Sequence, residues 1–152
     1  MHLIQELEKE LGKKHLPAVH VGDTVKVHYL IREGEKERIQ LFIGTVIRIA
    51  GRGINRAITV RRIVQGEGVE RMFPLHSPRV KDVEITRRGV VRRARLYFLR
   101  DRVGKKTRVK ELLGEKVRRE REREKALRAE IAADEARSNE EPTSEVEEAV
   151  EV

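Results

Sequence analysis

The chain has 152 residues, of which 38% are hydrophobic and 39% are charged, so it can fill the core of one compact domain but not of two. Only two tyrosines and three phenylalanines are present, and the core must therefore be small and mostly aliphatic. The absence of cysteine excludes disulfides, thiolate zinc sites, iron–sulfur clusters and a cysteine nucleophile.

The net charge of +8 is unevenly distributed along the chain. Residues 21–111 contain 23 Lys or Arg against 10 Asp or Glu, whereas residues 112–152 contain 8 against 13. Most of the central cations are arginines, whose planar guanidinium binds phosphate with two hydrogen bonds and stacks on bases. The arginines fall in strand-like segments and not on one face of an amphipathic helix, which favours a nucleic-acid partner over a membrane surface.

The N-terminus predicts a short helix. Leu3, Ile4, Leu7 and Leu11 recur at helical spacing, and Gly12 with the later Pro17 ends the pattern, giving a helix and linker over residues 1–20. The same segment carries three glutamates and is unlike a signal peptide, and no stretch approaches the ~20 apolar residues that span a bilayer. We therefore expect a cytoplasmic protein with no membrane partner.

Residues 21–110 predict a small antiparallel β-barrel. Alternating apolar and polar residues indicate a strand over 24–31, followed by a turn near Glu33 and Gly34. The next run, over 38–49, is too long for a straight strand, and Gly44 suggests a bulge or bend within it. Further strands are predicted over the following ranges: 57–64, 69–75, 82–89 and 91–100. About six short strands separated by glycine turns are typical of a closed sheet, and we predict a mainly β, SH3-like barrel.

The C-terminal part predicts two further segments. Residues 111–137 form a charged helical pattern with Glu115–Arg119 and Glu124–Arg128 spaced as i,i+4 pairs, and its interrupted apolar positions indicate a helix that projects from the body. Residues 138–152 contain six acids, no base and Pro142, a composition that predicts a disordered acidic tail.

No catalytic constellation is present in the sequence. The five histidines lack the HExxH spacing, and the two GxG fragments at residues 51–53 and 66–68 are typical of turns and not of a phosphate cradle. We predict no enzymatic activity, no cofactor, no metal and no small-molecule substrate.

Residues 86–110 form a continuous basic track. Period-two alternation places Arg93, Arg95 and Tyr97 on one face of the predicted last strand and Leu96 and Phe98 on the other. An edge strand protected by charge is the ordinary alternative, but it needs only a few charges, and clustering so many without a polyanion costs self-repulsion. A phosphate backbone is the partner that this track predicts.

A second predicted RNA-contacting surface is the loop after residue 73. Pro74 and Pro78 fix its backbone, and it displays His76, Ser77 and Arg79, which suit phosphate or 2′-hydroxyl contacts. The full set of candidate RNA-binding residues is Arg61, Arg62, Arg71, His76, Arg79, Arg87, Arg88, Arg92, Arg93, Arg95, Arg100, Arg102, Lys105, Lys106, Arg108 and Lys110.

Four segments carry a family resemblance: residues 22–47 (GDTVKVHYLIREGEKERIQLFIGTVI), 53–63 (GINRAITVRRI), 68–78 (GVERMFPLHSP) and 87–111 (RRGVVRRARLYFLRDRVGKKTRVKE). In this order and spacing they resemble the bacterial ribosomal large-subunit protein nineteen family. The resemblance implies an SH3-like barrel after an N-terminal helix and binding to large-subunit ribosomal RNA. It also implies a position at the interface between the subunits, with contacts to neighbouring ribosomal proteins and to the small subunit.

The sequence departs from the family pattern at three places. It has FIG for FEG at residues 42–44, AITVR for TFTVR at 57–61, and GEGVER for GVGVER at 66–71. Ile58 makes the core smaller, and Glu67 places an acid beside a loop that would otherwise suit RNA. The alternative function is a non-ribosomal RNA-binding assembly or regulatory factor built on the same type of barrel.

Overall fold

The computed structural model describes residues 6, 11–13, 16–102, 104–115, 117–119, 122, 123, 125–127, 129, 130 and 133. The chain divides into two compact units, residues 1–113 and 114–152, which are considered separately. The first unit is built on one antiparallel sheet, and the candidate site belongs to it.

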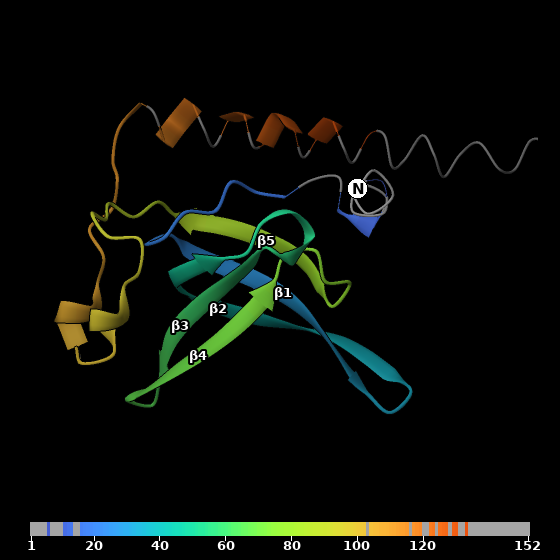
Figure 1. Cartoon of the computed structure of the whole chain (residues 1–152), viewed down its shortest axis with the longest axis horizontal. Helices are drawn as coiled ribbons and strands as arrows, with labels where there is room; N and C mark the ends of the chain where they lie inside the picture. Colours follow the sequence, from blue (N-terminus) through green and yellow to red (C-terminus); the bar gives the residue numbers. More distant parts are fainter. Residues whose placement is uncertain are drawn as a thin grey trace, which may run out of the picture. The chain divides into compact units, whose positions relative to one another are not determined.

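The sheet begins with a long hairpin of β1 (Thr24–Glu33) and β2 (Lys36–Ala50) (Figure 1). Glu33 pairs with Lys36 across a two-residue turn, and Gly34 takes a φ of 63° at its first position. A positive φ there suits a turn whose twist matches that of the strands, which is why glycine occupies the position. The strand and turn predicted from the alternating pattern are confirmed.

Three further strands complete the sheet: β3 (Ala57–Val64), β4 (Glu67–Pro74) and β5 (Val80–Arg87). The strand order is β4-β3-β2-β1-β5, so β5 returns to pair with the first strand (Figure 1). Short 3₁₀ turns lie at Gly53–Asn55, Tyr97–Leu99 and Gly104–Thr107. The prediction of a mainly β antiparallel fold is confirmed.

All five strands contribute side chains to one apolar core. The ring centroids of Tyr29 on β1 and Phe73 on β4 lie 5.8 Å apart, although β2 and β3 separate these strands in the sheet. The sheet is therefore strongly curled around its core, as twisted antiparallel sheets tend to be. Among the residues described, β4 and β5 remain the two edges and do not pair, so closure of the predicted barrel is not seen.

The irregularity in β2 lies at Ile47 and not at Gly44 as predicted. The register between β2 and β3 shifts between Val46 and Arg48, so Val46 and Ile47 are both fully buried but belong to different apolar clusters. Gly44 stays in the ladder opposite Val25. Glycine is required there because a Cβ atom would collide with the backbone carbonyl of Arg61.

The predicted last strand over residues 91–100 is wrong. This segment contains a 3₁₀ turn at Tyr97–Leu99, and only an isolated bridge joins Arg95 to Arg48. Leu96 and Leu99 are buried against Ile47, and the Leu96 N–H donates to the Ile47 carbonyl at 2.9 Å. A spacing of three between the buried leucines fits a tight turn, whereas a strand would have buried alternate residues. The described part of the chain thus has five strands and not six.

The terminal predictions fall largely outside the described residues. Glu6 and Leu11 have helical backbone, but the rest of the predicted N-terminal helix is not described. Between residues 115 and 133 the described residues are helical, and Arg119 lies 3.6 Å from Glu115, the predicted i,i+4 pair. The second predicted pair and residues 138–152 lie outside the described part. None of the described helical segments has the length and apolarity needed to cross a bilayer.

Candidate nucleic-acid interface

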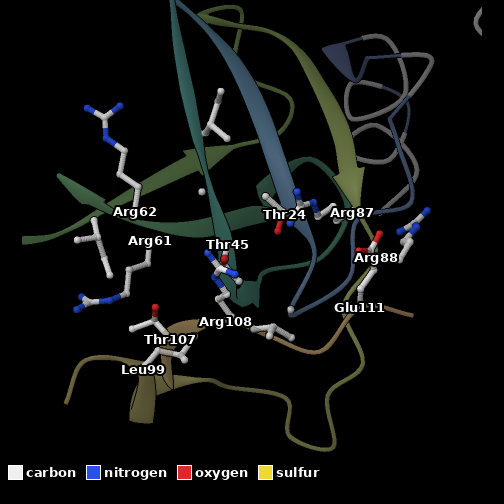
Figure 2. Close-up of a pocket in the computed structure, with 16 residues that line it drawn as sticks. Thr24, Thr45, Arg61, Arg62, Arg87, Arg88, Leu99, Thr107, Arg108 and Glu111 are labelled. Carbon is white, nitrogen blue, oxygen red and sulfur yellow. The ribbon is translucent and has the colours of Figure 1, made fainter. Parts of the chain in front are cut away.

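A cleft of about 510 Å³ opens between the middle of the sheet and residues 99–111, and we call it the sheet cleft. Figure 2 shows Arg61 and Arg62 of β3 on one side of it and Arg87 and Arg88, at the end of β5, on the other, with Arg108 between them. Glu111 is the one acidic residue among those that line it. These arginines come together because β5 pairs with β1 and because the chain after β5 passes β2, where Arg95 forms an isolated bridge with Arg48.

A second cleft, of about 360 Å³, is formed by residues 90–110, and we call it the loop cleft. Its lining residues are Val90, Val91, Arg92, Arg93, Leu96, Phe98, Leu99, Arg102, Lys106, Arg108, Val109 and Lys110. Six of these are cationic, six are apolar and none is acidic. Leu99, Arg108 and Val109 line both clefts, so the two form one adjoining basic surface.

Every aromatic ring of the chain has an arginine guanidinium over it, and all of these rings lie in the described residues. The guanidinium carbon to ring centroid distances are 4.4 Å for Arg62 over Phe42, 4.1 Å for Arg71 over Tyr29, 5.4 Å for Arg71 over Phe73, 4.5 Å for Arg100 over Tyr97, 4.6 Å for Arg102 over Phe98 and 6.0 Å for Arg93 over Phe98. Such contacts attract the cation to the ring face and restrict its rotamers before any ligand arrives.

Glu70 of β4 links the sheet to the segment that follows β5, through a contact with Arg100. Its carboxylate accepts hydrogen bonds from Arg61 at 2.9 Å and from Arg100 at 2.9 and 2.8 Å. The hydrogen bond from Arg100, followed by that from Arg61, lowers the pKa of Glu70 below its ordinary value. The charge of Arg61 and Arg100 is thereby partly balanced, and both guanidinium groups are held in fixed positions.

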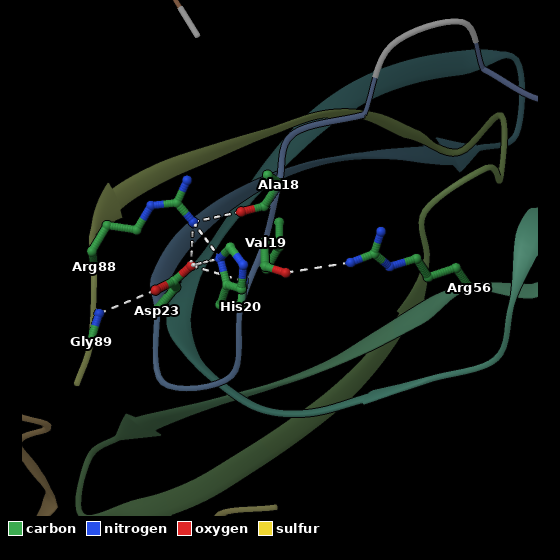
Figure 3. A network of polar contacts seen from close by, with 7 residues as sticks. All are labelled: Ala18, Val19, His20, Asp23, Arg56, Arg88 and Gly89. Atoms are coloured by element: carbon green, nitrogen blue, oxygen red, sulfur yellow. Dashed lines mark hydrogen bonds and ion pairs between the residues drawn. The ribbon is translucent and has the colours of Figure 1, made fainter. Parts of the chain in front are cut away.

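Arg88 differs from the other candidate residues because its side chain is only 6% exposed. Its guanidinium donates to the Asp23 carboxylate at 2.8 Å and to the Ala18 carbonyl at 2.5 Å (Figure 3). Asp23 is 1% exposed and also accepts the backbone N–H groups of His20 at 2.9 Å and Gly89 at 3.1 Å. This side chain is occupied in holding the fold, and we leave it out of the surface proposed to meet RNA.

The loop between β4 and β5 lies apart from both clefts. It leaves the sheet after Pro74, one residue later than predicted, and the Lys13 backbone N–H donates to His76 Nδ1 at 3.0 Å. Arg79 lies beside the Tyr29 hydroxyl, and its hydrogen bond lowers the pKa of that tyrosine. Candidate residues that line neither cleft are Arg71, His76, Arg79, Arg95, Arg100 and Lys105.

One group of side chains has donor atoms at metal-binding distances. Atoms of His28, Asp82 and Glu84 lie within 4.8 Å of one another. His28 Nε2 lies 3.3 Å from one oxygen of Glu84, and Lys26 Nζ lies 3.5 Å from the other. The neighbouring ammonium already balances part of this negative charge, and we assign no metal to the group.

Two acidic residues that hold arginines in place, Glu70 and Asp23, were not predicted from the sequence. Glu70 could have been found, because the two-residue turn at Gln65 and Gly66 sets a register in which Glu70 faces Arg61. Asp23 and Arg88 are 65 residues apart, and no local pattern in the sequence connects them.

We predict that Arg88→Met lowers the free energy of unfolding by about 3–5 kcal/mol, because it leaves the buried Asp23 carboxylate without its cation. Urea denaturation followed by circular dichroism measures the change. The control is Arg87→Met, which removes an exposed arginine from the adjacent position and should change stability by less than about 0.5 kcal/mol. Equal, small losses in both variants would contradict the structural role of Arg88.

Comparisons with known proteins show the family to which the chain belongs. The family model Ribosomal protein L19 matches residues 2–112. The chain is similar to "Large ribosomal subunit protein bL19" of Gloeobacter violaceus, with 59% identity over 114 residues that cover 75% of this chain and 94% of that protein. The proteins of the same name from Cyanothece sp. and Synechococcus elongatus are 62% and 61% identical over 109 residues, covering 72% of this chain and 91% of each relative. The resemblance predicted from the sequence is thus confirmed, and the chain belongs to the ribosomal protein L19 family.

Proposed function

We propose that this chain is a structural constituent of the large ribosomal subunit, which binds ribosomal RNA and catalyses no reaction. The observation that carries the proposal is the charge of the two adjoining clefts. Among the described residues, ten arginines or lysines and one acid, Glu111, line the two clefts. Because the chain belongs to a ribosomal protein family, ribosomal RNA is the polyanion that best matches such a surface.

The proposed mechanism is electrostatic. Arginine and lysine side chains that meet phosphates release condensed counterions, which supplies much of the binding free energy. The residues proposed to meet phosphates first are those that line the clefts and are not buried in the Asp23 pair: Arg61, Arg62, Arg87, Arg92, Arg93, Arg102, Lys106, Arg108 and Lys110. The remaining candidates, apart from Arg88, are proposed to make outer contacts along the same RNA.

Several finer features remain part of the proposal. The curled sheet supports an SH3-like barrel as the fold type, because side chains of β1 and β4 meet across its interior. The family context supports a position near the interface between the subunits, with contacts to neighbouring ribosomal proteins. The family match ends at residue 112, so the helix proposed for residues 111–137 and the acidic tail proposed for 138–152 fall largely outside it.

Sedimentation tests the ribosomal assignment. The tagged full-length chain, expressed in bacterial cells, should sediment with the large subunit at one copy per subunit, and should stay there through a high-salt wash. Quantitative mass spectrometry of the gradient fractions measures the ratio. Loss of the protein in the wash, with recovery in RNA-bound particles of other sizes, would contradict the proposal and favour a transient assembly or regulatory factor.

Salt dependence tests the electrostatic mechanism. The affinity for a fragment of ribosomal RNA should fall with salt at a log-log slope of about −0.9 for each phosphate neutralised, taking the value for duplex DNA. The double variant Arg93→Ala and Arg95→Ala should reduce the slope by about two if each side chain meets one phosphate. Fluorescence anisotropy at several salt concentrations measures this.

The matched control for that pair is the double variant Arg32→Ala and Arg38→Ala. These arginines are also exposed, but they lie near the β1–β2 turn and pair with Glu37 and Glu33. The control should leave the slope nearly unchanged. A nearly salt-independent affinity of the wild-type protein would rule out the mechanism.

A further inference from the structure

We infer that the loop cleft receives a single unstacked base of the bound RNA, while the cations around it meet the flanking phosphates. This inference rests on the proposed RNA-binding function and adds the RNA feature that the surface recognises. The composition of the loop cleft differs from that of an ordinary phosphate-binding surface.

The lining of the loop cleft combines two chemistries. Phosphates alone need only the cations, such as Arg92, Lys106 and Lys110, and would leave uncovered the apolar surface of the exposed Val90 and the half-buried Phe98. A nucleotide carries an anionic phosphate and a planar, largely apolar base face within one unit. It therefore matches both halves of the lining, whereas a fully paired duplex presents its backbone and keeps its base faces stacked inside.

The cleft also contains a planar stacking surface. The Arg102 guanidinium lies 4.6 Å from the centroid of the Phe98 ring, and the Arg102 side chain is exposed. Within the described residues no acidic side chain is paired with Arg102. Proteins that bind unpaired RNA stack bases on aromatic rings or on guanidinium planes, and the exposed Arg102 guanidinium, with the Phe98 ring beneath it, offers such a plane.

The size and rigidity of the cleft fit one base. Its volume of about 360 Å³ falls in the lower part of the range for pockets that hold small organic molecules, and is too small for a helix. Leu96 and Leu99 are buried against Ile47 and form a fixed floor. The site is therefore formed before RNA binds, which lowers the cost of ordering it.

The probes are two RNA hairpins that differ in one nucleotide. One has a single bulged 2-aminopurine, and the other is fully paired. Anisotropy gives the affinity of the full-length protein for each, and 2-aminopurine fluorescence reports stacking of the bulged base. We expect the wild type to bind the bulged hairpin about 5- to 150-fold more tightly, the range for stacking one base on an aromatic platform, with a change in fluorescence on binding.

Two variants separate stacking from charge. Arg102→Lys keeps the positive charge but removes the guanidinium plane, and Phe98→Leu keeps an apolar floor but removes the ring. Both should lose most of the preference for the bulged hairpin, while affinity for the paired hairpin and its salt slope stay within about twofold of the wild type. The matched control is Arg52→Lys, which should keep the preference for the bulged hairpin, because Arg52 is exposed, lines neither cleft and is not among the residues proposed to contact RNA.

Each alternative outcome is distinguishable. Equal, salt-dependent affinity of the wild type for both hairpins would overturn the base site and leave the proposed function standing. Binding of neither hairpin would count against both. Retention of the preference in Arg102→Lys and Phe98→Leu would also overturn the site. A synthetic peptide of residues 138–152, which combines acids with valines, tests whether the loop cleft binds an acidic peptide instead of a base. If this peptide displaces the bulged hairpin from the wild type at lower concentration than free hairpin does, the cleft is a peptide site.

Discussion

The buried ion pair between Asp23 and Arg88 is the contact on which the position of the basic surface depends. The described residues of the range 88–111 form no strand of the sheet, so side-chain and isolated backbone contacts must fix them. Asp23 precedes β1, and its carboxylate binds both the Arg88 guanidinium and the Gly89 N–H. Its own backbone carbonyl accepts the Val46 N–H at 2.8 Å. Burying two charges is favourable only when both are present and hydrogen-bonded, so this pair joins the segment to β1 and β2 in a single arrangement.

Concentrating many cations on one small domain creates repulsion that the structure must offset before RNA is bound. Glu70 offsets part of it by pairing with Arg61 and Arg100. The few aromatic rings offset a further part of this repulsion, because each ring attracts at least one guanidinium. Such a contact is worth about 0.5–1 kcal/mol at an exposed site. The same contacts restrict the arginine rotamers, so less conformational entropy is lost when phosphates bind. Two glycines make room for Arg61: Gly44 for its backbone carbonyl and Gly68 for its guanidinium.

The strands that alternate cleanly were predictable from the sequence, and the contacts that join distant segments were not. Val25 and Val27 are fully buried, and Thr24, Lys26 and His28 on either side of them are half-buried, as period two requires. The family resemblance was specific enough to be confirmed. The strand predicted over 91–100 failed because its apolar residues fit alternation nearly as well as the three-residue spacing of Leu96 and Leu99, and only packing against Ile47 decides between them. Arg88 was expected at the RNA surface because a charged side chain is usually exposed. Only the fold shows that it is buried and paired with Asp23. The sequence predicted Arg93 and Arg95 on one face of a strand, whereas a folded loop brings Arg93 together with Arg92 and Arg102 and leaves Arg95 outside the loop cleft.

Binding of ribosomal RNA by the two clefts is tested most directly by the chemical reactivity of individual arginines and lysines in the free protein and in the assembled large subunit. Modification of arginine by phenylglyoxal and of lysine by acetylation, read by mass spectrometry, gives a protection factor for each residue. If the two clefts bind ribosomal RNA, their residues, such as Arg92, Arg102, Lys106 and Lys110, should be strongly protected in the subunit, and Lys36 and Arg38 near the β1–β2 turn should be protected more weakly. Unchanged reactivity of the cleft residues on assembly would contradict the claim that this surface binds ribosomal RNA.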